Sequence, residues 1–236
     1  MKIGICFSGM CRSLEYVHES IKKHLIDSLE SEGHKVEIFA AVLNNKDSFK
    51  AKKYLSFDND KILYVDEAKH NIADRVNDRT KTGWEKLGHQ LNDIERSNSL
   101  RIKWQEKNNV NFDAVIRSRL DVLYLNDIKI NNIDLNFLNT PDFHNWRHVL
   151  GGGLNDRFVI SNQENMDKFT NIYQPFLNYC KSGKPVHAES FIFQHVKNLN
   201  LDVKENPFRF KRVRKDGRVL DHFLDKDKNE WEWYQH

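Results

Sequence analysis

The alternation of short apolar runs with a helical segment restricts the fold of this chain most. Residues 2–7, "KIGICF", and residues 35–43, "KVEIFAAVL", are continuous apolar runs typical of strands that are buried on both faces. Between them, apolar residues recur at helical spacing, and Gly33 is placed to end the helix: Leu14, Val17, Ile21, Leu25 and Leu29. Two buried strands joined by a helix are parallel neighbours, so the pattern predicts an α/β fold with a Rossmann-like, mostly parallel sheet flanked by helices.

The rest of the chain continues this alternation. Further strands are predicted at 61–66 and 157–161, a long helix runs from Trp84 to about Asn108, and another helix spans 187–199. Ser161 and Glu164 form a capping box for a helix that should bend at Pro175. Residues 44–83 and 126–150 are polar connections without a clear assignment, and a basic hairpin turns at 216–217. No linker interrupts the chain, so we expect a single domain.

Charge and composition exclude several classes of protein. The chain has 37 Lys and Arg against 34 Asp and Glu, and a net charge of +3 gives no reason to expect nucleic-acid binding. No apolar run is long enough for a transmembrane segment. The N-terminus resembles a first strand and not a signal peptide. Three cysteines at irregular spacing favour reduced thiols, so we expect a cytoplasmic protein.

Charged residues interrupt the apolar stretch 111–125, "NFDAVIRSRLDVLYL". Arg117, Arg119 and Asp121 alternate along the chain, so in an extended strand they share one side. Burying an unpaired charge in apolar surroundings costs on the order of several kcal/mol. The pattern therefore indicates either a site where arginines hold phosphate oxygens and Asp121 holds a cation, or an internal ion pair that satisfies itself.

Two glycine-containing loops are further candidates. Ser8, Gly9 and Arg12 follow the first strand, at a corner suited to an anion or to a structural turn alone. The loop "GGGLND" brings Asn155 and Asp156 either to a site, with Asp156 as general base, or to a plain surface turn.

Two more groups carry weaker signals. His187 and Glu189 lie in the first turn of a predicted helix, where acidic residues are also common as caps. The basic hairpin is interpreted mainly as a solvated strand face, with neutralisation of a diphosphate as the alternative.

The motifs and their order resemble one family of enzymes. "FSGMCRS", "FDAVIRSRLDVLY", "GGGLNDRFVIS" and "HAESFIFQHV" occur in an order similar to nucleotide-sugar glycosyltransferases of the GT-A fold. The resemblance is narrower to small viral and bacterial members with an R-x-R-x-D strand motif. It covers most of the chain, and it implies a nucleotide-binding half at 1–125 and an acceptor-side half at 126–236.

The resemblance also implies roles for individual residues. Donor-binding residues would be Phe7, Ser8, Gly9, Arg12, Arg117, Arg119 and Asp121. Asp121 would hold Mn²⁺ or Mg²⁺, although Arg119 stands where the family has the first acidic residue of Asp-x-Asp. This departure leaves two alternatives: Asp121 holds the ion alone, or arginines replace the ion. On the acceptor side, Asp156 would be the catalytic base, accompanied by Gly152, Gly153, Asn155, His187 and Glu189.

The expected reaction is the transfer of a sugar from a nucleoside diphosphate sugar to a carbohydrate hydroxyl, with inversion at the anomeric carbon slightly favoured over retention. Two alternatives remain at this level. The chain could be a sulfotransferase or another nucleotide-dependent group transferase that needs no metal. It could also be a catalytically silent module that binds glycans or nucleotides.

Overall fold

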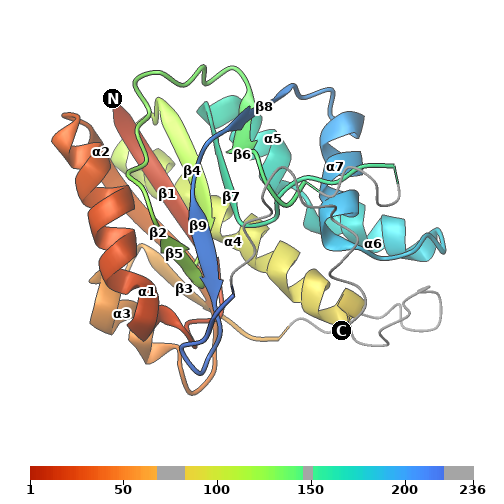
Figure 1. The fold of residues 1–236 in the computed structure, drawn as a ribbon, viewed down its shortest axis with the longest axis horizontal. Helices are drawn as coiled ribbons and strands as arrows, with labels where there is room; N and C mark the ends of the chain where they lie inside the picture. Colours follow the sequence, from red (N-terminus) through yellow and green to blue (C-terminus); the bar gives the residue numbers. More distant parts are fainter. Residues whose placement is uncertain (68–82, 146–150, 221–236) are drawn as a thin grey trace.

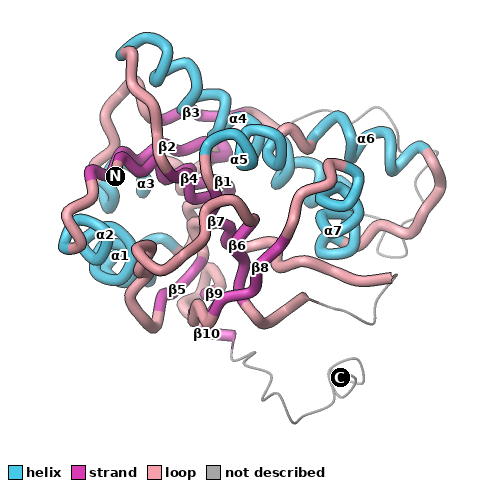
Figure 2. Tube along the Cα trace, turned by 90° about the horizontal axis from the view of Figure 1, so that it is seen from above, coloured by secondary structure: helices cyan, strands magenta, loops and turns pink. Residues whose placement is uncertain are grey.

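A computed structural model describes residues 1–67, 83–145 and 151–220. It is a mixed α/β structure with a seven-stranded sheet in the order β3-β2-β1-β4-β7-β6-β8 and with helices on both faces (Figure 1). Viewed from above, the strands run between α1 and α2 on one side and α4 and α5 on the other (Figure 2). The predicted α/β class and the mostly parallel sheet are confirmed.

The first four strands are parallel. They are β1 (Lys2–Gly9), β2 (Lys35–Leu43), β3 (Ile62–Val65) and β4 (Ala114–Arg119). β1 lies between β2 and β4, and its Ser8 is in register with Arg119. The chain moves outward from β1 to β2 and β3 and then returns to the other side of β1. This reversal makes the carboxyl ends of β1 and β4 the topological switch point, where open α/β sheets bind ligands.

Strands from the second half complete the same sheet. β7 (Phe158–Ser161) is antiparallel to β4 and to β6 (Leu138–Pro141), and β6 is parallel to β8 (Val203–Asn206). Strands of both predicted halves therefore pair in one sheet. Their division into a nucleotide-binding half and an acceptor-side half stays a prediction.

A small second sheet packs on the side of the main sheet that α1 covers. It contains β5 (Val122–Tyr124), β9 (Phe210–Val213) and β10 (Val219–Leu220), all antiparallel. The hairpin between β9 and β10 turns where the sequence predicts it, and Gly217 has a positive φ of 78° there. β4 and β5 are separated by only two residues, Leu120 and Asp121, so the charged stretch lies at the corner between the two sheets.

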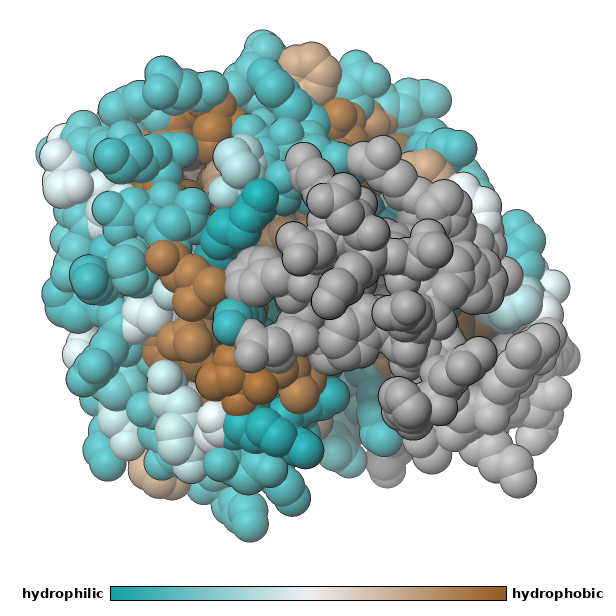
Figure 3. Space-filling view, in the orientation of Figure 1, coloured by the Kyte–Doolittle hydropathy of each residue, from teal (hydrophilic) through white to brown (hydrophobic). Residues whose placement is uncertain are grey.

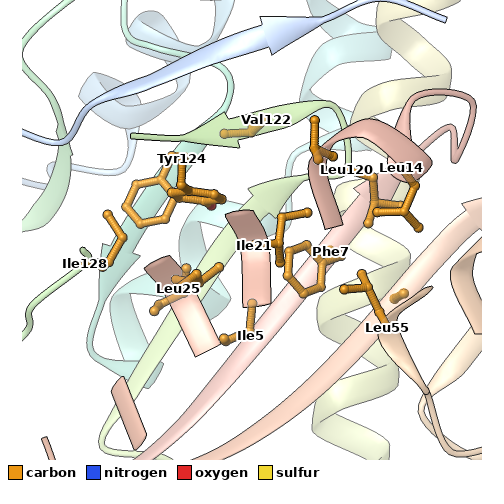
Figure 4. Close-up of a cluster of buried hydrophobic side chains, with 14 of the residues drawn as sticks. Ile5, Phe7, Leu14, Ile21, Leu25, Leu55, Leu120, Val122, Tyr124 and Ile128 are labelled. Carbon is orange, nitrogen blue, oxygen red and sulfur yellow. The ribbon is translucent and has the colours of Figure 1, made fainter. Parts of the chain in front are cut away.

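The first helical segment joins this small sheet in one apolar core. It consists of α1 (Leu14–Ile21), a π-helical turn (Lys22–Ile26) and α2 (Asp27–Ser31). The five apolar residues that predict this helix are fully buried. They pack with Ile3, Ile5 and Phe7 of β1 and with Leu120, Val122 and Tyr124 (Figure 4). The core thereby fixes the corner between β4 and β5 against β1.

The opposite face of the sheet is covered by α4 (Gly83–Asn108), α5 (Gln163–Thr170), α6 (Tyr173–Lys181) and α7 (Ala188–Asn198). α4 ends at the predicted residue, and its Trp84, Leu87, Leu91 and Ile94 are buried. α7 begins after His187, close to the prediction. No helix among the described residues is long and apolar enough to cross a membrane.

The polar seam between α4 and β1 departs from a simple apolar interface. Gly4 leaves room for Arg101, because a Cβ at residue 4 would lie 3.0 Å from Arg101 Cδ. Arg101 is fully buried and is paired with Asp167 and Asn98. Cys6 contacts Asn98 across the same seam, at 4.0 Å from Sγ to Oδ1. Gly4 and Cys6 of β1 therefore face polar residues of α4.

Several local predictions are wrong. Ser161 does not cap α5; its hydroxyl donates to the carbonyls of Leu135 and Phe137, and the side chain of Asn162 accepts from Asn165 N at 2.9 Å instead. The helix predicted to bend at Pro175 is two helices that separate before it. Pro175 lies in the first turn of α6, where no backbone N–H donor is needed.

Two unassigned regions contain regular structure. Within 44–83, residues Phe49–Leu55 form α3. Within 126–150, residues Leu138–Pro141 form β6, which the sequence does not signal because Asn and Pro are uncommon in strands. Buried Asn139 is accommodated there because its Nδ2 donates to the carbonyls of Asp134, Phe137 and Ile160.

Candidate functional site

A cavity of about 380 Å³ lies at the switch point of the sheet. Its lining from the strand ends is Ser8, Gly9, Met10, Arg12, Leu43, Arg119, Leu120 and Asp121. Its lining from α4 and β9 is Lys86, His89, Gln90, Asp93, Arg212 and Arg214. The cavity therefore combines the first loop, the charged corner after β4 and the basic hairpin, which are far apart in the sequence. On the face in Figure 3, apolar surface also gathers where Figure 1 shows β5 and the end of β9.

Five of the seven predicted donor-binding residues line this cavity: Ser8, Gly9, Arg12, Arg119 and Asp121. Gly9 has φ 111°, and a Cβ there would meet nothing within 4 Å, so the backbone is open to a ligand. Phe7 does not take the predicted place. Its side chain is fully buried and lies edge-on to Phe57, with ring centroids 6.3 Å apart, because odd-numbered residues of β1 face the apolar core.

Arg117 is the second predicted residue outside the cavity lining. It is 1% exposed, and its Nη1 donates to the backbone carbonyl of Asp156. Burial lowers the pKa of Arg117 to about 10, and the nearby Arg119 lowers it too, against the opposing effect of Asp156. Its other guanidinium nitrogens, Nε and Nη2, have no hydrogen-bond partner in the described structure. Arg117 therefore supports the loop that carries Asp156.

Arg119 and Asp121 are paired with each other. Arg119 Nε and Nη2 donate to the two oxygens of Asp121, each at 2.8 Å, and Arg212 Nε donates to Asp121 Oδ2 at 2.9 Å. Burial would raise the pKa of Asp121, but the two guanidiniums outweigh it and hold the pKa below its usual range. This pairing is the internal alternative that the sequence allows. The negative charge of Asp121 is therefore neutralised within the protein, without a ligand.

This arrangement does not fit a divalent cation at Asp121. Both carboxylate oxygens already accept hydrogen bonds from guanidinium groups, and a cation there would face two positive charges. Hard cations prefer several oxygen ligands, and within the described ranges no three His, Cys, Asp or Glu residues are grouped to hold a metal.

Asp156 belongs to the same charged network. Its Oδ2 accepts from Arg119 Nη1 at 2.8 Å and from Gln90 Nε2 at 2.9 Å, and Arg157 Nε lies 3.7 Å from Oδ1. Burial acts to raise the pKa of Asp156, but Arg119, Arg157 and Arg117 together hold it below its usual range. A carboxylate with a strongly lowered pKa is a weak proton acceptor, so the predicted role as general base has little support.

The predicted acceptor-side residues surround Asp156. Asn155 is buried and fixes the loop, since its Nδ2 donates to Phe143 O and its Oδ1 accepts from Arg157 N. Burial raises the pKa of Glu189 to about 7, and the nearby negative charge of Asp156 acts in the same direction. His187 Nε2 lies 3.5 Å from Glu189 Oε2, and burial lowers the pKa of His187. Glu189 thus has the proton affinity expected of a general base.

Gly152 and Gly153 line a second cavity of about 560 Å³, with Gly151, Leu154, Phe193, Val203, Lys204 and Glu205. Gly152 has φ 123°, and a Cβ there would lie 2.6 Å from the ring of Phe193. Only glycine fits at this contact. The glycine loop therefore borders a second cavity beside α7.

Three cations of the main cavity have no acidic partner in the part of the chain that the structure describes. The side chains of Arg12, Lys86 and Arg214 make no hydrogen bond or ion pair with any described residue. Arg119 and Arg212, by contrast, are engaged by Asp121. The cavity lining carries five cations against Asp93 and Asp121, so an anion is its natural ligand.

Asp93 is one of the cavity residues that the sequence analysis missed, together with Lys86, His89 and Gln90 of the same helix. It is 4% exposed, lines the cavity and makes no hydrogen bond or ion pair with another described residue. Burial raises its pKa to about 7, against a smaller lowering by Arg96. A signal exists, since Lys86, Gln90 and Asp93 recur at helical spacing on α4, but the apolar positions that define this helix conceal it.

No protein-family model matches the chain, and no curated protein matches it. Function must therefore be inferred from the geometry of the site.

The buried carboxyl of Asp93 predicts a pH-dependent stability difference between the wild type and Asp93→Asn. The raised pKa means that the folded state holds a proton that the unfolded state releases near pH 4. Wild-type stability should therefore fall, relative to the variant, as the pH rises from about 4 to about 7. We expect Asp93→Asn to be more stable than wild type by about 3 kcal/mol at pH 8, and the difference to shrink near pH 4.

Urea unfolding of both proteins at several pH values measures this difference, and Glu106→Gln, an exposed carboxylate of the same helix, is the control. A wild type that is as stable as Asp93→Asn at pH 8 would contradict the burial of an unpaired carboxylate.

Proposed function

We propose that the protein is a glycosyltransferase that moves a sugar from a nucleoside diphosphate sugar to a carbohydrate hydroxyl. The observation that carries this proposal is the group of three cations around one cavity at the switch point that have no partner among the described residues, Arg12, Lys86 and Arg214. Open α/β sheets bind nucleotides at this place, and phosphates are the usual partners of converging arginines. The resemblance of the motifs to glycosyltransferases of the GT-A fold points to the same ligand.

The cations suit the departure of a nucleoside diphosphate. When the bond between the sugar and the diphosphate breaks, negative charge develops on the leaving phosphate oxygen. Cations fixed before the reaction stabilise that charge without reorganising. Arg12 and Arg214 provide guanidinium groups that can bind phosphate oxygens bidentately, and Lys86 adds an ammonium group.

A divalent cation held by Asp121 is not part of the proposal, because Arg119 and Arg212 occupy that carboxylate. We propose instead that Asp121 positions the two arginines along the cavity wall. The positive charge that Mn²⁺ or Mg²⁺ would provide at the diphosphate comes, in this proposal, from protein side chains.

We assign the general base to Glu189 and a positioning role to Asp156. Glu189 would take the proton of the acceptor hydroxyl, whose oxygen then attacks the anomeric carbon as the bond to the diphosphate breaks. A single displacement of this kind inverts the anomeric centre. Asp156 raises the proton affinity of Glu189 and is itself held by Arg119, which also lines the donor cavity. Arg119 thus connects the two halves of the proposed site.

The unpaired cations predict how nucleoside diphosphates bind. In buffer with EDTA, we expect the wild type to bind at least one of UDP, GDP, ADP, CDP and dTDP. Lys86→Gln and Arg214→Gln should each weaken that binding roughly five- to tenfold, since each removes one charge-assisted contact. Isothermal titration calorimetry measures both effects.

Lys215→Gln is the matched control, because Lys215 is an exposed cation of the same hairpin outside the cavity. Equal weakening by Lys215→Gln would assign the effect to net charge and not to the cavity. Binding that appears only when Mn²⁺ is added would contradict the metal-free part of the proposal.

The base assignment predicts the effect of Glu189→Gln on transfer. Using the nucleotide sugar that binds best and a panel of glycan acceptors, we expect kcat to fall by about 10²-fold or more while donor affinity changes little. Wild-type kcat should rise with pH through about pH 7, as Glu189 loses its proton. Asp156→Asn tests the rival assignment, and a loss of kcat there with normal turnover by Glu189→Gln would reverse the two roles.

The same assays separate the alternative functions. Sulfate transfer from a nucleotide donor without sugar transfer would identify a sulfotransferase. Nucleotide binding without transfer, and without slow hydrolysis of any nucleotide sugar, would indicate a silent binding module.

A further inference from the structure

Among the described residues, the polar side chains between β1 and α4 are hydrogen-bonded at one end of this seam, but not at the end that reaches the cavity. Gly4 faces Arg101, and Cys6 faces Asn98. The next even-numbered residue of β1 is Ser8, which is 2% exposed and whose hydroxyl has no hydrogen-bond partner in the described structure. Asp93, the carboxyl on α4, is 4% exposed and makes no hydrogen bond or ion pair with another described residue.

Geometry places Ser8 and Asp93 at the same level of this seam. From Gly4 to Ser8 the strand advances about 13 Å, and from Arg101 back to Asp93 the helix advances about 12 Å. Ser8 and Asp93 both line the cavity, and no hydrogen bond joins their side chains. Two buried polar groups facing one cavity without partners are expected to meet those partners in a ligand.

The position of this pair relative to the cations indicates which part of a ligand it meets. Arg12 follows Ser8 four residues later on the same loop, and Lys86 precedes Asp93 by seven residues, two helical turns, on α4. A ligand whose diphosphate lies against these cations brings its ribose next to them, because the ribose carries the diphosphate at its 5′ oxygen. Met10 and Leu43 add apolar wall to the same cavity, which suits the base beyond the ribose.

We propose that Asp93 and Ser8 bind the vicinal hydroxyls of the ribose, and that the site selects ribonucleotides over 2′-deoxyribonucleotides. A carboxylate can accept hydrogen bonds from both hydroxyls of a diol, as acidic residues do in other dinucleotide-binding sheets. The Ser8 hydroxyl can accept or donate to the same group. This inference rests on the proposed nucleotide function and specifies its ligand.

The test compares each ribonucleoside diphosphate with its 2′-deoxy counterpart by calorimetry, for ADP, GDP, CDP and UDP. For the wild type we expect removal of the 2′ hydroxyl to weaken binding roughly tenfold or more, as a lost hydrogen bond to a charged group does. In Asp93→Ala this ratio should fall towards one, and in Ser8→Ala it should fall partly. Glu106→Gln should keep the wild-type ratio.

Each outcome bears on a different statement. A wild-type ratio near one with clear binding of the diphosphates would overturn the ribose assignment and leave the proposed function intact. A preserved ratio in Asp93→Ala, with the variant folded by circular dichroism, would also overturn it. A strong preference for guanine with equal binding of GDP and dGDP would assign Asp93 to the base edge and contradict the proposal. Absence of binding by every nucleoside diphosphate, and by pyrophosphate, would remove the proposed function itself.

Discussion

The ion-pair network at the end of β4 determines how the rest of the site is arranged. Asp121 is held by Arg119 and by Arg212, and Arg119 also holds Asp156. These contacts join the main sheet, the small sheet and the glycine loop at one corner. Removing one partner of a buried ion pair costs about 3–5 kcal/mol, so the network fixes the geometry strongly. Because Asp121 and Asp156 are both engaged by arginines of the network, the cavity cations that have no partner among the described residues are the ones available to a ligand.

The cavity therefore has parts with different chemistry. Arg12, Lys86 and Arg214 form a cationic part with no partner among the described residues. Ser8 and Asp93 form a buried part, in which the Ser8 hydroxyl has no hydrogen-bond partner in the described structure and burial raises the pKa of Asp93 to about 7. A nucleoside diphosphate offers phosphates to the first and hydroxyls to the second. On the other side of Arg119, Glu189 has the raised proton affinity that an acceptor hydroxyl requires. The proposed donor and acceptor sites thus meet at one arginine.

The sequence predicts the architecture well because apolar periodicity records burial directly. The strands at 2–7, 35–43 and 61–66, the long helix after Trp84 and the first loop all follow from it. Pairing between distant residues leaves no such record. The periodicity cannot indicate that Arg212 neutralises Asp121, or that Phe7 faces the core and not the ligand. It also cannot indicate that Asp93 is buried, because the helix is recognised only by its apolar residues. β6 is missed for the same reason, since its buried Asn139 is stabilised by carbonyls that come from the adjoining turn and from β7.

The central claim is that Arg12, Lys86 and Arg214 form a diphosphate site that needs no metal at Asp121. A crystal structure of the protein with a bound nucleoside diphosphate, grown in EDTA, tests it most directly. We predict phosphate oxygens within hydrogen-bonding distance of these three side chains, with the Arg119–Asp121–Arg212 pairing unchanged. A diphosphate bound elsewhere, or an Asp121 released from both arginines to face the ligand, would contradict the account.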